Sequence, residues 1–173
     1  MTNQKAPLEA NDLQSLEDVT VEVNDPIPKV SLYDTDMNRV KVQKGSKGKS
    51  TVIAFYPGAF TPVCTKEMCT FSSEIDKLNS LNANVIGISV DSPFSNKAFK
   101  ETNKINFALL SDYRRKAVKK FGIELKDFKG MEGYTVAKRS VFIANKDGII
   151  TYRWVSEDPA VEPDYEEIKA ALA

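Results

Sequence analysis

Two cysteines stand close together in the stretch PGAFTPVCTKEMC, and they are the residues of this chain best suited to chemistry. Cys64 and Cys69 are the only cysteines among 173 residues, and they lie five positions apart, directly behind a Thr-Pro pair. Two cysteines are too few to staple a small secreted scaffold, so a close pair is more often chemical than structural. Redox chemistry of a thiolate is therefore the first hypothesis.

Cys64 is expected at the start of a helix that follows a buried strand. The apolar run TVIAF (51–55) has the length of a central strand. Thr61 suits the N-cap position and Pro62 the first helical position. Cys64 would then be about the third helical residue, where free backbone N–H groups and the helix dipole favour an anion. The position predicts a cysteine that is substantially ionised near neutral pH.

The spacing keeps the two sulfurs apart on an intact helix. Cys64 shares a stripe of three- and four-residue spacing with Met68 and Phe71, which predicts that it faces inward at the mouth of a pocket. Cys69 lies about 140° further around, with its Cα about 8.6 Å from that of Cys64. A disulfide needs Cα atoms within roughly 7 Å, so bonding would require the first helical turns to unwind. Taken alone, Cys69 could equally be a small buried hydrophobe.

The composition excludes several other kinds of site. The chain has no histidine, so Cys-His and Ser-His catalytic pairs and His-containing metal sites cannot be built. Two thiols alone make a poor zinc site. We therefore predict no metal and no bound cofactor.

Charge and hydropathy limit the classes of binding partner that we expect for this chain. The 24 basic and 24 acidic residues cancel, which predicts no binding of nucleic acid or of an anionic membrane. No apolar run approaches the roughly 20 residues of a membrane span, and the first residues lack the hydrophobic stretch of a signal peptide. With so few cysteines, we expect a reducing, cytoplasmic setting.

Strand and helix patterns alternate along the chain, which predicts an α/β sandwich with a mixed central sheet flanked by helices. This order is also thioredoxin-like, and the fold alone does not decide function. We expect a weakly ordered arm over 1–18 and a single domain over 19–173, opening with a hairpin-like set of short strands over 19–42. The other expected strands are 51–55, 84–90, 107–112 and a hairpin over 139–155; the expected helices are 63–81, 92–104, 113–121 and 164–172.

Pro57, Thr61 and Cys64 reproduce the P-x-x-x-T-x-x-C signature, and with it the chain resembles the peroxiredoxins, thiol peroxidases on a thioredoxin-like fold. The segments GISVDSPF, LLSDYRR and AKRSVFIANKDG resemble family segments in the same order. The chain is most similar to the bacterioferritin-comigratory-protein (Q-type) branch, in which a second cysteine can follow five residues later, as Cys69 does.

The resemblance implies a role for each of these residues. Cys64 would be the peroxidatic cysteine, Thr61 would hydrogen-bond the sulfur and the peroxide, and Pro57 would shield the pocket. Arg139, which opens the apolar strand SVFIA, would steady thiolate and peroxide. Cys69 would form a disulfide with oxidised Cys64, and a thioredoxin-like dithiol would reduce it. The substrate would be hydrogen peroxide or an alkyl hydroperoxide, and the protein a monomer or a homodimer.

Several alternatives stay open at this point. A thiol–disulfide oxidoreductase would share the fold, although C-x4-C replaces C-x2-C and no proline precedes Ser140. A non-catalytic binding module is the other competitor. Glu67 could hold Arg139 or be a solvated helix carboxylate, and Arg139 itself could lie at the surface. The basic residues of 114–120 could be a solvated helix face or a docking site for an acidic reductant.

Overall fold

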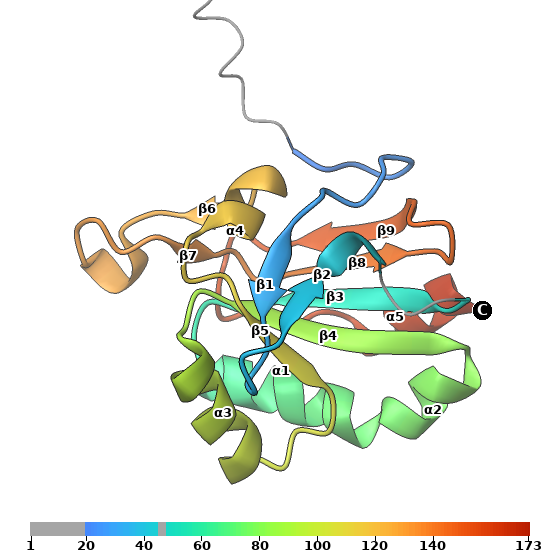
Figure 1. Cartoon of the computed structure of the whole chain (residues 1–173), viewed down its shortest axis with the longest axis horizontal. Coiled ribbons are helices and arrows are strands. Elements are labelled where there is room, and N and C mark those ends of the chain that lie inside the picture. Colours follow the sequence, from blue (N-terminus) through green and yellow to red (C-terminus); the bar gives the residue numbers. More distant parts are fainter. Residues whose placement is uncertain (1–19, 45–47) are drawn as a thin grey trace, which may run out of the picture.

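A mixed β-sheet forms the centre of the computed structural model, which describes residues 20–44 and 48–173 (Figure 1). Its strands are β1 (Ser31–Tyr33), β2 (Arg39–Lys41), β3 (Ser50–Phe55), β4 (Ala83–Ser89), β5 (Ala108–Ser111), β8 (Ser140–Ala144) and β9 (Ile150–Val155). These seven strands lie in the order β2-β1-β5-β4-β3-β8-β9. Two short strands, β6 (Glu124–Leu125) and β7 (Val136–Ala137), pair separately.

The sheet is mixed, as predicted. The three strands β3, β4 and β5 are parallel, whereas β8 pairs antiparallel with both β3 and β9. All of β8 and all but the first residue of β3 are buried. Their continuous apolar sequences follow from that burial, because central strands are covered on both faces. The predicted fold class is confirmed.

The helices are α1 (Pro62–Ser73), α2 (Ile75–Ser80), α3 (Pro93–Thr102), α4 (Lys116–Lys120) and α5 (Tyr165–Leu172), with short 3-10 turns at Val42–Lys44 and Phe128–Gly130. Side chains alternate along β3, so that Val52 and Ala54 pack with α1, α2, α3 and α5, while Ile53 and Phe55 pack with α4 on the other face. Figure 1 shows α1 and α3 on one side of the sheet and α4 on the other.

Gly87 in β4 lets α1 approach the sheet closely. A Cβ atom at this position would lie 2.7 Å from Leu109 Cδ2 and 3.3 Å from Met68 Sδ. A glycine inside a strand often marks such an approach. Because Met68 is one helical turn beyond Cys64, this contact sets how deeply the first turns of α1 are buried.

Two predicted helices are shorter than expected. The helix predicted over 63–81 is interrupted at Glu74, whose φ of −90° and ψ of 0° end α1. Just before the break, the Ser73 hydroxyl donates to the Thr70 carbonyl at 2.8 Å, a local bond of the kind that competes with regular helix. The helix predicted over 113–121 begins only at Lys116, because Arg115 is left-handed with a φ of 55°.

The predicted N-terminal hairpin is confirmed for β1 and β2, but the segment TVEV (20–23) is not a strand. It is followed by Pro26, which has no N–H for a ladder and makes only a single bridge, to Ile149. The predicted arm over 1–18 and the central residues of the KGSKGKS loop, 45–47, lie outside the described residues. Within the described part of the chain, no helix is long and apolar enough to cross a membrane.

Candidate active site

Cys64 lies where the sequence places it, in the first turn of α1. The helix begins at Pro62, and Thr61 occupies the N-cap position with φ −74° and ψ 145°. Since β3 ends at Phe55, the cysteine follows the carboxyl end of a central strand, where α/β sheets bind ligands. The side chain of Cys64 is 0% exposed. The thiol faces inward, as the helix periodicity predicts, and it is enclosed by the core that α1 forms with the sheet.

Thr61 caps the helix through its backbone rather than its side chain. Its carbonyl accepts bonds from the backbone N–H and the hydroxyl of Thr65, both at 2.9 Å. Its own hydroxyl donates to the Gly58 carbonyl at 2.8 Å. Within the described residues that hydroxyl oxygen accepts no hydrogen bond, so its lone pairs can accept one from a ligand.

The loop between β3 and α1 is fastened to the neighbouring strand. The backbone N–H of Ala59 donates to Asp91 Oδ2 at 2.8 Å, and the Ser89 hydroxyl donates to the same oxygen at 2.7 Å. Pro57, at the beginning of this loop, is buried. The loop that carries Pro57 and Thr61 is therefore tied to the end of β4.

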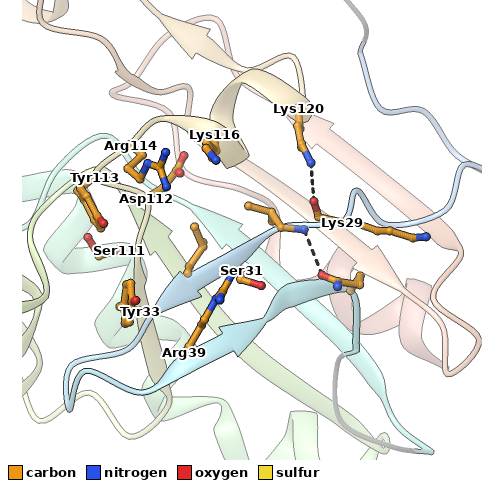
Figure 2. A pocket seen from close by; sticks show the side chains of 13 residues that line it. Lys29, Ser31, Tyr33, Arg39, Ser111, Asp112, Tyr113, Arg114, Lys116 and Lys120 are labelled. Carbon is orange, nitrogen blue, oxygen red and sulfur yellow. Dashed lines mark hydrogen bonds between the residues drawn. The ribbon is translucent and has the colours of Figure 1, made fainter.

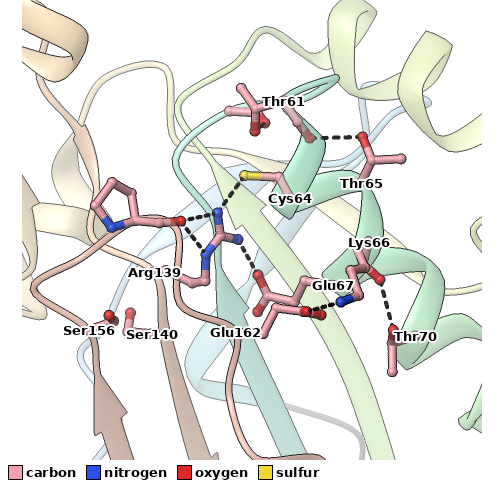
Figure 3. A network of polar contacts seen from close by, with 12 residues as sticks. Thr61, Cys64, Thr65, Lys66, Glu67, Thr70, Arg139, Ser140, Ser156 and Glu162 are labelled. Carbon is pink, nitrogen blue, oxygen red and sulfur yellow. Dashed lines mark hydrogen bonds and ion pairs between the residues drawn. The ribbon is translucent and has the colours of Figure 1, made fainter.

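Arg139 reaches Cys64 across the site (Figure 3). It directly precedes β8, its side chain is buried, and its Nη2 lies 3.1 Å from the Cys64 Sγ. Its Nη1 forms an ion pair with Glu67. Its Nε and Nη2 donate to the Pro159 carbonyl at 3.0 and 2.8 Å. The guanidinium is thus fixed by two residues of α1 and by the loop after β9.

Glu67 is buried one turn after Cys64, on the same side of α1. Burial raises its pKa to about 7, although the Arg139 guanidinium pulls the value down. Its Oε1 is enclosed and has no hydrogen-bond partner among the described residues. Because the structure pairs it with Arg139, the alternative of a solvated helix carboxylate is wrong.

The site holds one permanent cation between two groups that can carry negative charge. Burial by itself would lower the pKa of Arg139, but the Glu67 carboxylate and the Cys64 sulfur outweigh it and raise that pKa. The guanidinium therefore stays charged, and the alternative of a surface arginine is wrong. Sequence reasoning missed the Pro159 carbonyl, because a backbone acceptor on a loop leaves no signal in residue type.

Cys69 shares α1 with Cys64 but is only partly buried, and both thiols are free. The helix is continuous between them, so the separation expected for an intact helix applies. Within residues 20–44 and 48–173, no group of three or more Cys, Asp or Glu side chains is placed to hold a metal ion.

Comparisons with known proteins point to one family. A model described as the AhpC/TSA family matches residues 23–153. "Peroxiredoxin Q, chloroplastic" of Oryza sativa subsp. japonica is 37% identical over 125 residues, which are 72% of this chain and 55% of that protein. The chain thus spans about half the length of the curated relatives it matches.

Solved structures agree with that assignment. A peroxiredoxin-like protein from Aquifex aeolicus superposes with a TM-score of 0.78 at 28% identity, covering 89% of this chain and 87% of the other. The Peroxidoxin BcpB from Mycobacterium tuberculosis superposes with a TM-score of 0.75 at 26% identity, covering 87% and 95%.

Glu67 should make the free energy of unfolding fall as the pH rises toward neutrality. Its pKa is raised from 4.5 to about 7 in the folded protein, so the folded state holds the proton more tightly than the unfolded chain. That contribution is fully present below a pH of about 4.5 and is lost as the pH rises through about 7. The amide of Glu67→Gln does not titrate, so the parent should lose stability relative to this variant over that interval, by up to about 3 kcal/mol.

Urea unfolding of both proteins at several pH values measures the difference. The other carboxylates are common to both proteins and cancel, and no histidine titrates in the interval. A difference that stays constant from acid to neutral pH would show that folding does not raise the pKa of Glu67.

Proposed function

The chain belongs to the AhpC/TSA family of peroxiredoxins, and on that premise we propose that it is a thiol peroxidase whose Cys64 reduces hydrogen peroxide or an alkyl hydroperoxide. The observation that supports this most strongly is the buried Arg139 guanidinium, 3.1 Å from the Cys64 sulfur. A thiolate beside a fixed positive charge is a reactive thiolate.

The reaction needs no group beyond the chain and the peroxide. The Cys64 thiolate attacks the terminal oxygen of the peroxide, the S–O bond forms as the O–O bond breaks, and the sulfur becomes a sulfenic acid. The leaving oxygen departs as hydroxide or alkoxide and takes up a proton, giving water or alcohol. Sulfur is oxidised by two electrons, and the peroxide is reduced by two.

Arg139 acts on the charge that moves during this step. Negative charge passes from sulfur to the leaving oxygen, and a donor already held in place stabilises it without reorganisation. Glu67 and the Pro159 carbonyl hold the guanidinium before any substrate arrives. The Thr61 hydroxyl, with lone pairs to spare, accepts a hydrogen bond from the peroxide, and Pro57 shields the site from water.

Cys69 completes the cycle as the resolving cysteine. Its thiol displaces the hydroxyl group of the Cys64 sulfenic acid, giving an intrachain disulfide and water. Because α1 is intact in the reduced protein, its first turns unwind for this step, while Phe71 and Leu78 remain packed in the core. The same opening exposes the buried Cys64 to solvent. A thioredoxin-like dithiol then reduces the disulfide by exchange.

The proposal also includes the cellular location and the oligomeric state of the protein. The cytoplasmic location expected from the sequence stays a prediction, since the rice relative is named as a chloroplast protein. Whether the protein is a monomer or a homodimer also stays a prediction.

Cys64→Ser tests the nucleophile. The substitution is nearly isosteric, so the fold should survive while peroxide consumption supported by dithiothreitol falls to the rate without enzyme. Cys69→Ser is the matched control, because it removes the other thiol of the same helix and should keep the first turnover. Activity that persists in Cys64→Ser, or insulin reduction by the parent without peroxide consumption, would contradict the proposal.

Arg139→Met tests the cation. Methionine retains much of the packing of the arginine stem, and the peroxide rate constant should fall by at least about a hundredfold, the roughly 2.7 kcal/mol that one transition-state donor contributes. Stopped-flow measurement of peroxide decay gives the constant. Arg153→Met, on the neighbouring strand β9, removes a charge away from Cys64 and should leave the rate within about twofold. Equal rates in all three proteins would remove Arg139 from the mechanism.

Cys69→Ser tests the resolving step under turnover. After its first turnover this variant should accumulate sulfenic and then sulfinic acid on Cys64 and lose cycling with a thioredoxin system, as mass spectrometry and coupled NADPH oxidation would show. The oxidised parent should instead carry a Cys64–Cys69 bond. Parental cycling by the variant, or an oxidised parent linked between two chains, would make Cys69 a core residue and the enzyme a one-cysteine peroxidase.

A further inference from the structure

A cavity of about 440 Å³ lies between β1 and the segment that leads into α4 (Figure 2). In the strand order, β1 and β5 are on one side of β4, whereas β3, which leads to the helix of Cys64, is on the other. The cavity exists because β1 pairs with β5 at one position only, Tyr33 with Ser111. Beyond that pair the two segments of the chain separate. At the other end, Lys120 Nζ donates to the Lys29 carbonyl at 2.5 Å and joins the two walls. The volume is within the range of small-molecule sites, roughly 300–1,000 Å³.

Positive charge is concentrated in this cavity. The whole chain balances 24 basic against 24 acidic residues, yet the lining has five basic side chains and one carboxylate. The five are Lys29, Arg39, Arg114, Lys116 and Lys120, of which Lys29 extends its ammonium group away from the others (Figure 2). None of them forms an ion pair with a carboxylate of residues 20–44 or 48–173. Their mutual repulsion favours any bound anion.

The single carboxylate of the lining does not neutralise these cations. Asp112 is buried, and its two oxygens accept the backbone N–H groups of Ala117 and Val118 at 3.0 and 2.9 Å. Arg115 is separate from the cluster, since it donates to the carbonyls of Thr135 and Tyr113. Three residues of the basic stretch expected from the sequence to be solvated, Arg114, Lys116 and Lys120, are exposed and also line this cavity.

The lining has two chemically different ends. Figure 2 shows Tyr33 and Tyr113 at one end and Lys29 and Lys120 at the other. Both tyrosines are exposed, at 38% and 47%, so their rings are open to contact. Guanidinium and ammonium groups are the usual partners of phosphate oxygens, and exposed aromatic rings stack with planar ligand groups.

We propose that this cavity binds the diphosphate or triphosphate group of a small molecule. The cations supply several charge-assisted donors to a ligand with more than one phosphate, and the polar lining disfavours an apolar ligand. The group can belong to a nucleotide, whose base would meet the tyrosines, or to an inorganic polyphosphate. The cavity shares no residue with the Cys64 site, so binding is measured without peroxide and independently of peroxidase activity.

Isothermal titration calorimetry of the full chain with pyrophosphate at low salt tests the proposal. We expect saturable one-to-one binding that weakens at least about tenfold in Lys116→Glu and in Arg39→Glu, the lower end of what one charged hydrogen bond contributes. Lys119→Glu is the matched control, since it makes the same charge change on the same helix at an exposed residue outside the lining. It should bind within about threefold of the parent. Absence of saturable binding, or equal weakening in Lys119→Glu and Lys116→Glu, would overturn the site.

A parallel titration with ADP distinguishes the two sources of the group. Tighter binding of ADP than of pyrophosphate, lost in Tyr113→Ala, would support the cavity as a nucleotide site. Equal affinity for both, unchanged in Tyr113→Ala, would support it as a site for the phosphates alone. ADP binding that persists undiminished in both Lys116→Glu and Arg39→Glu would place the ligand elsewhere and contradict the proposal.

Discussion

A single buried positive charge organises the candidate active site. The Arg139 guanidinium lies between the Cys64 thiol and the Glu67 carboxyl, and it supplies the positive charge that a buried anion needs as a partner. Burial raises the pKa of Glu67 to about 7 even beside Arg139, so this carboxyl changes its charge near neutral pH. When Glu67 is protonated, more of the charge of Arg139 is available to the sulfur.

The fold brings three segments that are far apart in the sequence together around the Arg139 guanidinium. The antiparallel pairing of β3 with β8 places Arg139 beside the strand that leads to α1. Gly87 lets α1 dock closely enough for Cys64 to be enclosed, and the loop after β9 supplies the Pro159 carbonyl that completes the hydrogen bonding of the guanidinium. Removing one of these partners from the buried guanidinium would strongly destabilise the folded protein. The packing and the chemistry therefore depend on the same contacts.

Local sequence predicted the parts of this arrangement that are set locally. The apolar runs identified the buried strands, and Thr61 and Pro62 marked the start of α1, because caps and periodicity act within a few residues. The break at Glu74 and the late start of α4 were missed, since they depend on hydroxyl bonds and on one left-handed residue. Arg139 was identified only through resemblance, because its contact with Cys64 spans 75 positions of sequence. The basic cavity could not be foreseen, since it arises where two strands separate.

We propose that Cys64, beside Arg139, is the thiol that reacts with peroxide. The most direct test of this proposal is peptide mass spectrometry of the reduced protein after one equivalent of hydrogen peroxide, with a sulfenic-acid trapping reagent present from the start. We expect the trapped adduct on Cys64, with Cys69 either unmodified or bonded to Cys64. An adduct found mainly on Cys69, or spread equally over both cysteines, would contradict it.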